Sequence, residues 1–553
     1  MLRAFALLLL LAAGARAPIK RPHYTDASPR SSFSYVSNND FQKRKYFQQP
    51  MCGGVGILDY DGDGWMDIFF SNGAKLPELK KTDSSFDNCL LRNRGDGTFE
   101  DVTAQAGLTG HNLDFSYGVA VGDYDNDGRP DIFVANTGKN TLYHNNGNGT
   151  FSDVTDGSGL DKKPPETLSV QAAWFDYDND GLLDLVLSNY TLWTPEKDRR
   201  CEKNGVDAYC SPRTYPSVPH RLYRNLGHGK FEDVTEKSGL GKALGKGMGI
   251  AIADFNSDGW MDIFIANDTE RNFLFLNQGN GTFKEVGLLY GVAYNDSAST
   301  VSAMGADAKD YDNDGWVDIF YSNLMGQIWG LYHNQRGKSF RYVSPGARIL
   351  QLSEPLSGWS NAFLDYNNDG WKDLYSANGD VDNLVPNASQ HDTMFENVDG
   401  KEFIDVSQEM GTDFRRTGFQ RGSAIADLNN DGFPDLVVTS LNQKPRILLN
   451  SADNGNHWLM IQATGHRSNR DAIGTQIKVI TPSGRALYNH VTVSVGFMSS
   501  SDRRVLFGLG SERSASAVEI RWPSGIVQHL KDVPADQLLK VEEPGAGTPI
   551  HLN

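Results

Sequence analysis

Aspartate, asparagine and glycine recur in one nine-residue pattern, D-x-[DN]-x-D-G-x-x-D, which occurs seven times along the 553-residue chain. In each copy, positions one, three, five and nine carry a carboxylate or an amide oxygen. Oxygens at alternate positions of a tight loop can converge on one hard cation, and Ca²⁺ takes about six to eight of them. The spacing therefore predicts about seven structural calcium sites. The copies begin at Asp59, Asp123, Asp176, Asp254, Asp310, Asp365 and Asp427.

Positions six and seven of the pattern complete the predicted loop. The glycine at position six tolerates the positive φ that lets the loop fold back. Position seven varies in side chain, which suits a ligand given by its backbone carbonyl. The predicted ligand sets are, in chain order, Asp59, Asp61, Asp63, Trp65 and Asp67; Asp123, Asp125, Asp127, Arg129 and Asp131; Asp176, Asp178, Asp180, Leu182 and Asp184; Asp254, Asn256, Asp258, Trp260 and Asp262; Asp310, Asp312, Asp314, Trp316 and Asp318; Asp365, Asn367, Asp369, Trp371 and Asp373; Asp427, Asn429, Asp431, Phe433 and Asp435.

The loops differ from EF-hands at position twelve and in the segments after the loops. An EF-hand needs a bidentate Glu at position twelve, and this position holds Phe70, Val134, Leu187, Ile265, Tyr321, Ser376 and Val438. The segments after the loops, such as DIFFSN and DIFVAN, are rich in β-branched and aromatic residues and predict strands. A polar turn without a metal is the alternative interpretation, because Asp and Gly are common in turns. Seven copies with about the same ligand set favour the metal.

The spacing of the loops predicts a repeat architecture. Their starts are 64, 53, 78, 56, 55 and 62 residues apart, a period typical of propeller blades. A short strand, a Gly-rich turn and an F-x-x-V segment recur between them, so each unit offers four strands. We predict an all-β protein, with a seven-bladed β-propeller over residues 30–452 and a small antiparallel β-domain over residues 453–545. The last unit lacks its F-x-x-V strand, and we expect the FSYV segment at 33–36 to pair there and close the ring.

Four cysteines predict two disulfides in an exported protein. Cys201 and Cys210 lie in an insertion of the third unit, around residues 190–220, which we expect to project from the ring. Cys52 and Cys89 flank the first calcium loop and are predicted to pair within the first blade. Free buried thiols are the alternative.

The start of the chain indicates the cellular compartment. Residues 1–17 combine a basic residue, a short apolar run and small residues, which predicts a secretory signal peptide without a membrane span. We therefore expect a secreted, extracellular or periplasmic protein.

The formal net charge is −17, and seven Ca²⁺ ions would contribute +14 and leave −3. Most of the acidity thus belongs to the loops, and no basic patch indicates nucleic-acid binding.

The seven loops resemble the FG-GAP repeats of integrin α-chain propellers, also called VCBS-like repeats. The C-terminal segments GTQIKV, GFMSSSDRRVLFGLG and VEIRWPSG look like an ASPIC/UnbV domain. Together they resemble the cartilage acidic protein 1 family over nearly the whole mature chain. The resemblance implies an integrin-α-like, calcium-stabilised propeller followed by an ASPIC/UnbV-like domain. Animal members carry a Cys-rich EGF-like module at their end, so this chain resembles a shorter form without it.

The sequence favours two classes of function, and the UnbV part of the domain resemblance implies a third, sequestration of a secondary metabolite, which no residue supports directly. The first is a non-catalytic, calcium-dependent binding or adhesion protein for an extracellular protein or polysaccharide, with unknown oligomeric state. It is favoured because the motifs of hydrolases and zinc enzymes are missing. The second is an extracellular polysaccharide lyase or hydrolase with its site in the propeller channel, which rests on analogy between folds. Titratable side chains converging on the channel would favour the enzyme.

Overall fold

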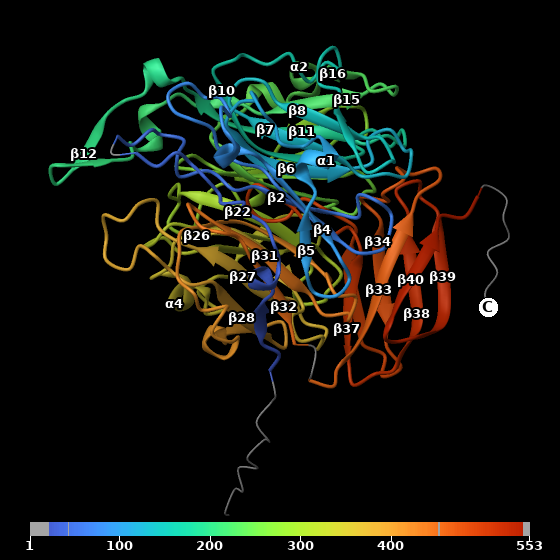
Figure 1. Cartoon of the computed structure of the whole chain (residues 1–553). Helices are drawn as coiled ribbons and strands as arrows, with labels where there is room; N and C mark the ends of the chain where they lie inside the picture. Colours follow the sequence, from blue (N-terminus) through green and yellow to red (C-terminus); the bar gives the residue numbers. More distant parts are fainter. Residues whose placement is uncertain (1–20, 43, 452–453, 546–553) are drawn as a thin grey trace, which may run out of the picture.

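The computed structural model describes residues 21–42, 44–451 and 454–545, and it is built almost entirely from strands (Figure 1). Seven of its sheets share one order, in which four consecutive strands pair antiparallel with their neighbours. In six of these sheets the strands follow the chain, and the seventh takes its outer strand from the N-terminus. The strands are, sheet by sheet, β2 (Val55–Leu58), β3 (Asp67–Phe70), β4 (Cys89–Asn93) and β5 (Phe99–Asp101); β6 (Ser116–Gly122), β7 (Asp131–Asn136), β8 (Thr141–Asn145) and β9 (Phe151–Asp153); β10 (Thr167–Phe175), β11 (Asp184–Leu192), β15 (Arg221–Asn225) and β16 (Phe231–Asp233); β18 (Gly247–Ala253), β19 (Asp262–Asn267), β20 (Phe273–Asn277) and β21 (Phe283–Glu285); β22 (Ala303–Lys309), β23 (Asp318–Asn323), β24 (Gly330–Asn334) and β25 (Phe340–Tyr342); β26 (Gly358–Leu364), β27 (Asp373–Asn378), β28 (Thr393–Val398) and β29 (Glu402–Asp405); β30 (Gln420–Ala426), β31 (Asp435–Ser440), β32 (Arg446–Asn450) and β1 (Tyr24–Asp26).

Each predicted calcium loop joins the first two strands of one sheet, as the strand patterns indicated. Six of the predicted F-x-x-V segments form the fourth strand, from β5 to β29. Short helices follow four of these outer strands: α1 (Thr103–Ala106), α2 (Thr235–Ser238), α3 (Gly287–Tyr290) and α4 (Ile349–Ser353). The predicted all-β class and its propeller-like repeats are therefore confirmed.

Glycines in the first strands let neighbouring sheets approach closely. A Cβ on Gly118 in β6 would lie 2.3 Å from the carbonyl oxygen of Val170 in β10. A Cβ on Gly422 in β30 would lie 2.4 Å from the carbonyl oxygen of Gly53, just before β2. The second contact joins the last sheet to the first, so the sheets form a ring. These contacts support the seven-blade count, which stays a prediction.

The ring is closed by a different N-terminal segment from the one predicted. β1 pairs with β32, and Tyr24 lies opposite Asn450. The prediction that residues 33–36 form this strand is wrong. Phe33 and Tyr35 are buried in an apolar cluster with Val55 and Ile447, between the first and last sheets. Their alternating apolar pattern reflects burial between two sheets, and the paired strand begins before the predicted boundary at residue 30.

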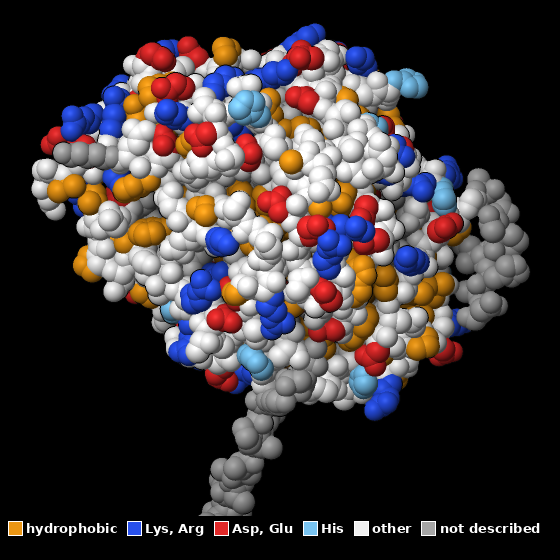
Figure 2. All heavy atoms as spheres, in the orientation of Figure 1, with side chains coloured by type: hydrophobic (Ala, Val, Ile, Leu, Met, Phe, Trp, Pro, Cys, Tyr) orange, Lys and Arg blue, Asp and Glu red, His pale blue; other side chains and the backbone are white. Residues whose placement is uncertain are grey.

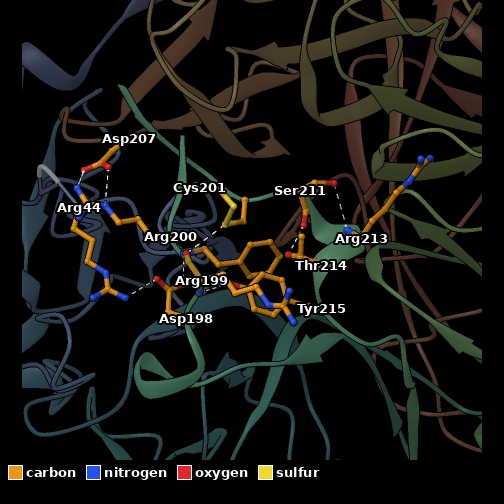
Figure 3. The surroundings of a disulfide bond; sticks show 12 residues. Arg44, Asp198, Arg199, Arg200, Cys201, Asp207, Ser211, Arg213, Thr214 and Tyr215 are labelled. Atoms are coloured by element: carbon orange, nitrogen blue, oxygen red, sulfur yellow. Dashed lines mark hydrogen bonds and ion pairs between the residues drawn. A yellow bond between two sulfur atoms is a disulfide. The ribbon is translucent and has the colours of Figure 1, made fainter. Parts of the chain in front are cut away.

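The insertion in the third unit projects from the ring, as expected (Figure 1). It carries the hairpin β12 (Cys201–Lys203) and β13 (Val206–Ala208), and then β14 (Val218–Pro219), which pairs with β17 (Leu244–Gly245). Cys201 and Cys210 form the predicted disulfide, with Cα atoms 5.2 Å apart. The buried side chain of Asp198 anchors the insertion, because it accepts a hydrogen bond from Arg44 (Figure 3) and another from the indole of Trp193.

The predicted Cys52–Cys89 disulfide is wrong, because both residues are free, buried thiols. Cys52 lies just before β2, and Cys89 begins β4. Strand β3 lies between these strands in the sheet. Two strand spacings amount to about 9.6 Å, which exceeds the Cα separation of about 7 Å that a disulfide can bridge.

Residues 454–545 form two further sheets beside the ring (Figure 1). One has the order β37-β33-β40 and the other β35-β34-β38-β39. Strand β40 runs parallel to β33, so the prediction of a purely antiparallel domain is wrong. Strand β36, between β35 and β37, instead extends the first sheet of the ring by pairing parallel with β2. The strands are β33 (His457–Thr464), β34 (Gln476–Ile480), β35 (Ala486–His490), β36 (Ser499–Ser500), β37 (Val505–Gly510), β38 (Ser514–Arg521), β39 (Val527–Pro534) and β40 (Gln537–Glu542).

The distribution of charged side chains and the lengths of the helices can be compared with the expected partners. Acidic and basic side chains are interspersed over the face shown in Figure 2. Among the described residues, no helix is long and apolar enough to cross a bilayer. The predicted signal peptide at residues 1–17 lies outside the described residues.

Candidate metal centres

The seven loops share one set of hydrogen bonds around the position-one aspartate. Its two carboxylate oxygens accept the backbone N–H groups of positions five and six, over 2.9–3.1 Å and 2.7–3.0 Å. The position-five carboxylate accepts the N–H of position seven over 2.8–3.0 Å. The position-six glycine has a positive φ in every loop, for example 89° at Gly64 and Gly128. The loops are therefore preformed, with their carboxylates on the inside.

The position-nine aspartate begins the second strand and is fully buried in all seven loops, at 0% exposure. One of its oxygens accepts the N–H of the asparagine at the end of the third strand, over 2.7–2.8 Å. In six loops the other oxygen accepts the N–H of position two. This carboxylate thus fixes the loop to both neighbouring strands.

The structure brings positions one, three and nine together in three of the loops. In loops one, two and three, carboxylate oxygens of these positions lie within 4.8 Å of one another, as in the set Asp123, Asp125 and Asp131. Three buried carboxylate oxygens there have no hydrogen-bond partner: Oδ1 of Asp125, Oδ2 of Asp131 and Oδ1 of Asp178. Burying such oxygens without a partner is unfavourable. The oxygen-only donor set therefore fits a hard cation, and several of these acidic clusters could bind a metal ion.

Burial also changes the acidity of these groups. Removal from water raises the pKa of Asp176 and Asp427 to about 7, and that of Asp123, which also faces Asp471, to about 8. Burial raises the pKa of Asp131 to about 7, although hydrogen bonds from His144 and Asn145 oppose the shift. Burial therefore favours the protonated form of these four carboxyl groups when no cation neutralises them.

The residue before the third-strand asparagine differs between loops and faces positions three and five. Arg92 lies 2.8 Å from Asp61, and Arg224 lies 2.7 Å from Asp178. His333 takes the same place in loop five, with Nε2 2.9 Å from Asp312. His144 in loop two lies 3.4 Å from Asp125. These cationic or titratable side chains partly balance the negative charge of the carboxylates in four of the loops.

The four position-seven tryptophans pack on the outer hairpin of their own sheet. A Cβ on the turn glycine Gly95 would lie 2.7 Å from the indole of Trp65, and one on Gly279 would lie 2.9 Å from that of Trp260. Trp316 and Trp371 lie against Gly337 and Gly400 in the same way. The role of position seven as a carbonyl ligand stays a prediction.

The asparagine at or next to the end of each third strand was not predicted from the sequence. Its side-chain amide donates to the carbonyl of position two in the preceding loop, over 2.7–2.9 Å. Asn93 reaches Leu428 in this way, so the same bond also joins the first sheet to the last. An Asn two residues before the turn glycine recurs in most of the hairpins and could have revealed it. The seven residues are Asn93, Asn145, Asn225, Asn277, Asn334, Asn397 and Asn450.

The role of position four was not predicted either. Asn126, Asn179, Asn313, Asn368 and Asn430 have positive φ there, and their amides donate to the position-six glycine carbonyl of the next loop. Neighbouring loops are thus linked directly, which fixes their relative positions.

Family comparisons agree with this arrangement. The sequence matches the FG-GAP-like repeat family over residues 59–134, 123–187, 216–265, 254–321 and 310–376. Most of these matches begin at one predicted calcium loop and continue through the next. Residues 465–548 match the ASPIC and UnbV family.

Curated relatives match over most of the chain. Cartilage acidic protein 1 of Mus musculus is 24% identical over 494 residues, which cover 85% of this chain and 70% of the relative. The Homo sapiens protein of that name is 23% identical, with 85% and 69% covered. Among solved structures, an Agrocybe aegerita lectin that recognises terminal N-acetylglucosamine is 15% identical, with a TM-score of 0.40, and covers 74% of this chain and 94% of its own. A rhamnogalacturonan lyase of Bacillus licheniformis is 12% identical, also with a TM-score of 0.40, and covers 78% and 76%.

Proposed function

Because the chain belongs to the FG-GAP-like repeat family and carries an ASPIC and UnbV domain, we propose that it is a secreted calcium-binding protein. It binds an extracellular protein or polysaccharide and catalyses no reaction. The observation that carries the calcium assignment is the repeated convergence of buried carboxylates, with partnerless oxygens on Asp125, Asp131 and Asp178.

Calcium has a structural role in this proposal. The carboxylates or amides of positions one, three, five and nine and the carbonyl of position seven would hold one ion in each of about seven loops. The ion supplies charge neutralisation to carboxylates that the fold has already removed from water. The residues themselves orient the loop and link it to the next sheet, so calcium stabilises the ring rather than forming a reaction centre.

Secretion is supported by the disulfide in the projecting insertion. Cys201–Cys210 is a bond of the kind that persists in oxidising compartments. Residues 1–17 supply the export signal in this proposal.

The alternative of an enzyme in the channel is less well supported. Residues 493–501 of the C-terminal domain hydrogen-bond to the innermost strands, for example through Gly496 and Ala306. They occupy the place where the alternative puts its substrate. The ligand of this protein is therefore expected on the outer surface of the ring or on the projecting insertion.

Chelation tests the calcium assignment. A site whose ligand is present at about 100 times its Kd contributes about 2.7 kcal/mol to stability, so EDTA should lower the Tm strongly and added Ca²⁺ should restore it. Equilibrium dialysis should detect several ions per chain. Mg²⁺ at the same concentration serves as the comparison. An unchanged Tm together with no bound Ca²⁺ would refute the proposal.

Matched variants localise the ions. Asp131→Asn keeps the shape of a buried ligand and removes its charge, and should lower the calcium count by about one. Asp156→Asn is the control, because that side chain is 90% exposed and lies outside the loops. Equal counts for Asp131→Asn and the control would exclude loop two as a calcium site.

The ligand class is tested separately. A screen against polysaccharides and extracellular proteins, with and without Ca²⁺, should detect saturable binding that chelation weakens. Turnover of any polysaccharide by the purified chain would favour the enzyme instead.

A further inference from the structure

One loop of the C-terminal domain lies along the axis of the sheet ring. We call residues 491–504, between β35 and β37, the axial loop. Both ends belong to the domain, since Val491 donates its N–H to Thr475 and Val505 pairs with Ile461. Ser501 donates to the carbonyl of Val493 over 2.9 Å. The loop is therefore a hairpin that enters and leaves on the same side.

The axial loop contacts the first strand of every sheet in the ring. These strands would otherwise present unpaired backbone groups to the axis. Strand β36 pairs with β2, and Gly496 exchanges two backbone hydrogen bonds with Ala306 of β22. The loop accepts backbone N–H groups from β6, where Val119 donates to the Met498 carbonyl and Val121 to Ser500 Oγ, and from β30, where Ile425 donates to Ser501 Oγ. The loop donates to the other three strands: Met498 N–H to Gln171 Oε1 of β10, Ser494 Oγ to the Ile250 carbonyl of β18, and Phe497 N–H to Ser360 Oγ of β26.

The tip of the axial loop reaches the opposite side of the ring. Phe497 and Met498 are fully buried in one apolar cluster with Trp359, Cys52 and Trp193. Cys52 belongs to the segment before β2, and Trp193 to the base of the disulfide-bonded insertion. The tip of the axial loop thus packs in the same apolar cluster as a residue at the base of the insertion.

The C-terminal domain also bonds to five of the candidate metal loops: to loop five through the backbone N–H of Tyr488, which donates to Asn313, and to four others through side chains. Asp471 accepts the N–H of Asp123 in loop two over 2.8 Å, and Gln476 donates to Oδ2 of Asp254 in loop four over 3.2 Å. Arg485 donates to the carbonyl of Asp369 in loop six, and the buried Arg504 to that of Asp427 in loop seven, over 2.7 and 2.8 Å.

We propose that the C-terminal domain is an internal partner of the ring, held by the axial loop, and that Ca²⁺ in loops two, four, six and seven strengthens its docking. The calcium part rests on the proposed function, whereas the docking part does not. A cation in loop two removes the repulsion between Asp471 and the loop carboxylates. A cation in loop four fixes Asp254, which also accepts from Gln476.

Cleavage between the two parts tests the docking. A protease recognition sequence is inserted between Ser451 and Asn454 of the full chain, which is then cut after folding in Ca²⁺. The two parts should co-elute in gel filtration at micromolar concentration. Separation of the wild-type parts in Ca²⁺ would overturn the docking.

Chelation of the cut protein tests the link to calcium. The urea concentration that separates the parts should be clearly lower in EDTA than in Ca²⁺, and their Kd at least tenfold higher. Equal values in the two buffers would overturn the link. Equilibrium dialysis of the same samples distinguishes this result from a chain that binds no Ca²⁺, which would refute the proposed function and leave the docking result intact.

Two glycine variants of the cut protein give a matched comparison. Gly496 lies in the axial loop with φ 78°, and a Cβ there would lie 2.2 Å from Ser360 Oγ. Gly484 has φ 88° in an open turn, with nothing within 4 Å. Gly496→Val should weaken association at least tenfold more than Gly484→Val, and equal effects would count against the axial loop. If Gly496→Val does not fold, Ser494→Ala, which removes one bond to β18, should still raise the Kd, and an unchanged Kd would contradict the proposal.

Discussion

At the scale of single residues, the asparagine of each third strand links its own sheet to the preceding one. Its N–H fixes the position-nine carboxylate of its own sheet, and its side chain reaches the loop of the preceding sheet. One residue type thus connects ligand geometry with the packing of the sheets. The metal loops and the sheet interfaces are therefore not independent.

Replacing one of these asparagines should destabilise the ring. Asn225→Ala leaves the carbonyls of Tyr124 and Leu183 without their amide donor. A buried group that loses its hydrogen bond costs about 1–3 kcal/mol, and urea unfolding in Ca²⁺ should show a loss of this size. Asn146→Ala, at an exposed turn position of the preceding sheet, should change stability by less than about 0.5 kcal/mol. Equal losses would contradict the role of Asn225.

A buried histidine should make the fold sensitive to acid. His220 is fully buried, its Nδ1 accepts the N–H of Asn189, and burial lowers its pKa from 6.5 to about 3. The folded protein accommodates only the neutral imidazole of His220. The stability that this residue contributes is therefore complete above pH 6.5 and is lost as the pH falls toward 3. At pH 5 the loss from this residue is about 2 kcal/mol.

The His220→Asn variant should therefore lose less stability than the parent chain between pH 7.5 and 5, although it is less stable at pH 7.5. Urea unfolding at both values measures the difference. His111→Asn, at an exposed position, should keep the pH dependence of the parent. A His220→Asn variant with the parent's pH dependence would show that this histidine does not titrate as described.

At the scale of elements, the repeated loops and hairpins could be predicted because they carry local signals. Aspartate spacing indicated the loops, and the F-x-x-V segments indicated the outer strands. The closing strand β1 could not be recognised, since YTD has only three residues and no periodicity. Phe33 and Tyr35 produced a stronger strand signal, but that signal came from burial between two sheets. The parallel pairing of β33 with β40 joins segments about 80 residues apart, and no local pattern specifies it.

Removing β1 should open the last sheet. A chain that begins at residue 28 lacks the partner of β32 and also the ion pair between Asp26 and Arg416. It should unfold at a lower urea concentration than a chain that begins at residue 21, and should aggregate through the exposed edge of β32. Light scattering during heating measures the aggregation. Equal behaviour of the two chains would contradict closure by β1.

At the scale of the whole molecule, two features matter: the negative charge of the metal loops and the packing of the axial loop inside the ring. The formal charge of −17 is concentrated in loops around the ring. The axial loop could not be predicted, because the segment VTVSVGFMSSSDRR has no motif that specifies a partner. Three of its serines, Ser494, Ser500 and Ser501, bond to backbone groups of β18, β6 and β30.

Calcium should therefore control how the whole molecule responds to salt. Without Ca²⁺ the loop carboxylates repel one another, and salt screens this repulsion. Raising NaCl from about 0.05 to 0.5 M should increase the Tm of the EDTA-treated protein more than that of the Ca²⁺-loaded protein. Scanning calorimetry in both buffers measures the two shifts. Equal shifts would mean that the loop charges do not limit the stability of the calcium-free chain.

The hairpin form of the axial loop has a topological consequence. Both ends of the loop return to the same domain, so the described chain enters and leaves the axis on one side of the ring. The loop can enter a completed ring and leave it again without unthreading the polypeptide. Since residues 491–504 follow all the strands of the ring in the chain, a ribosome can complete the ring before the loop exists. The axial loop can then insert into the ring after the ring has folded. Its insertion can also be reversed without unfolding the ring.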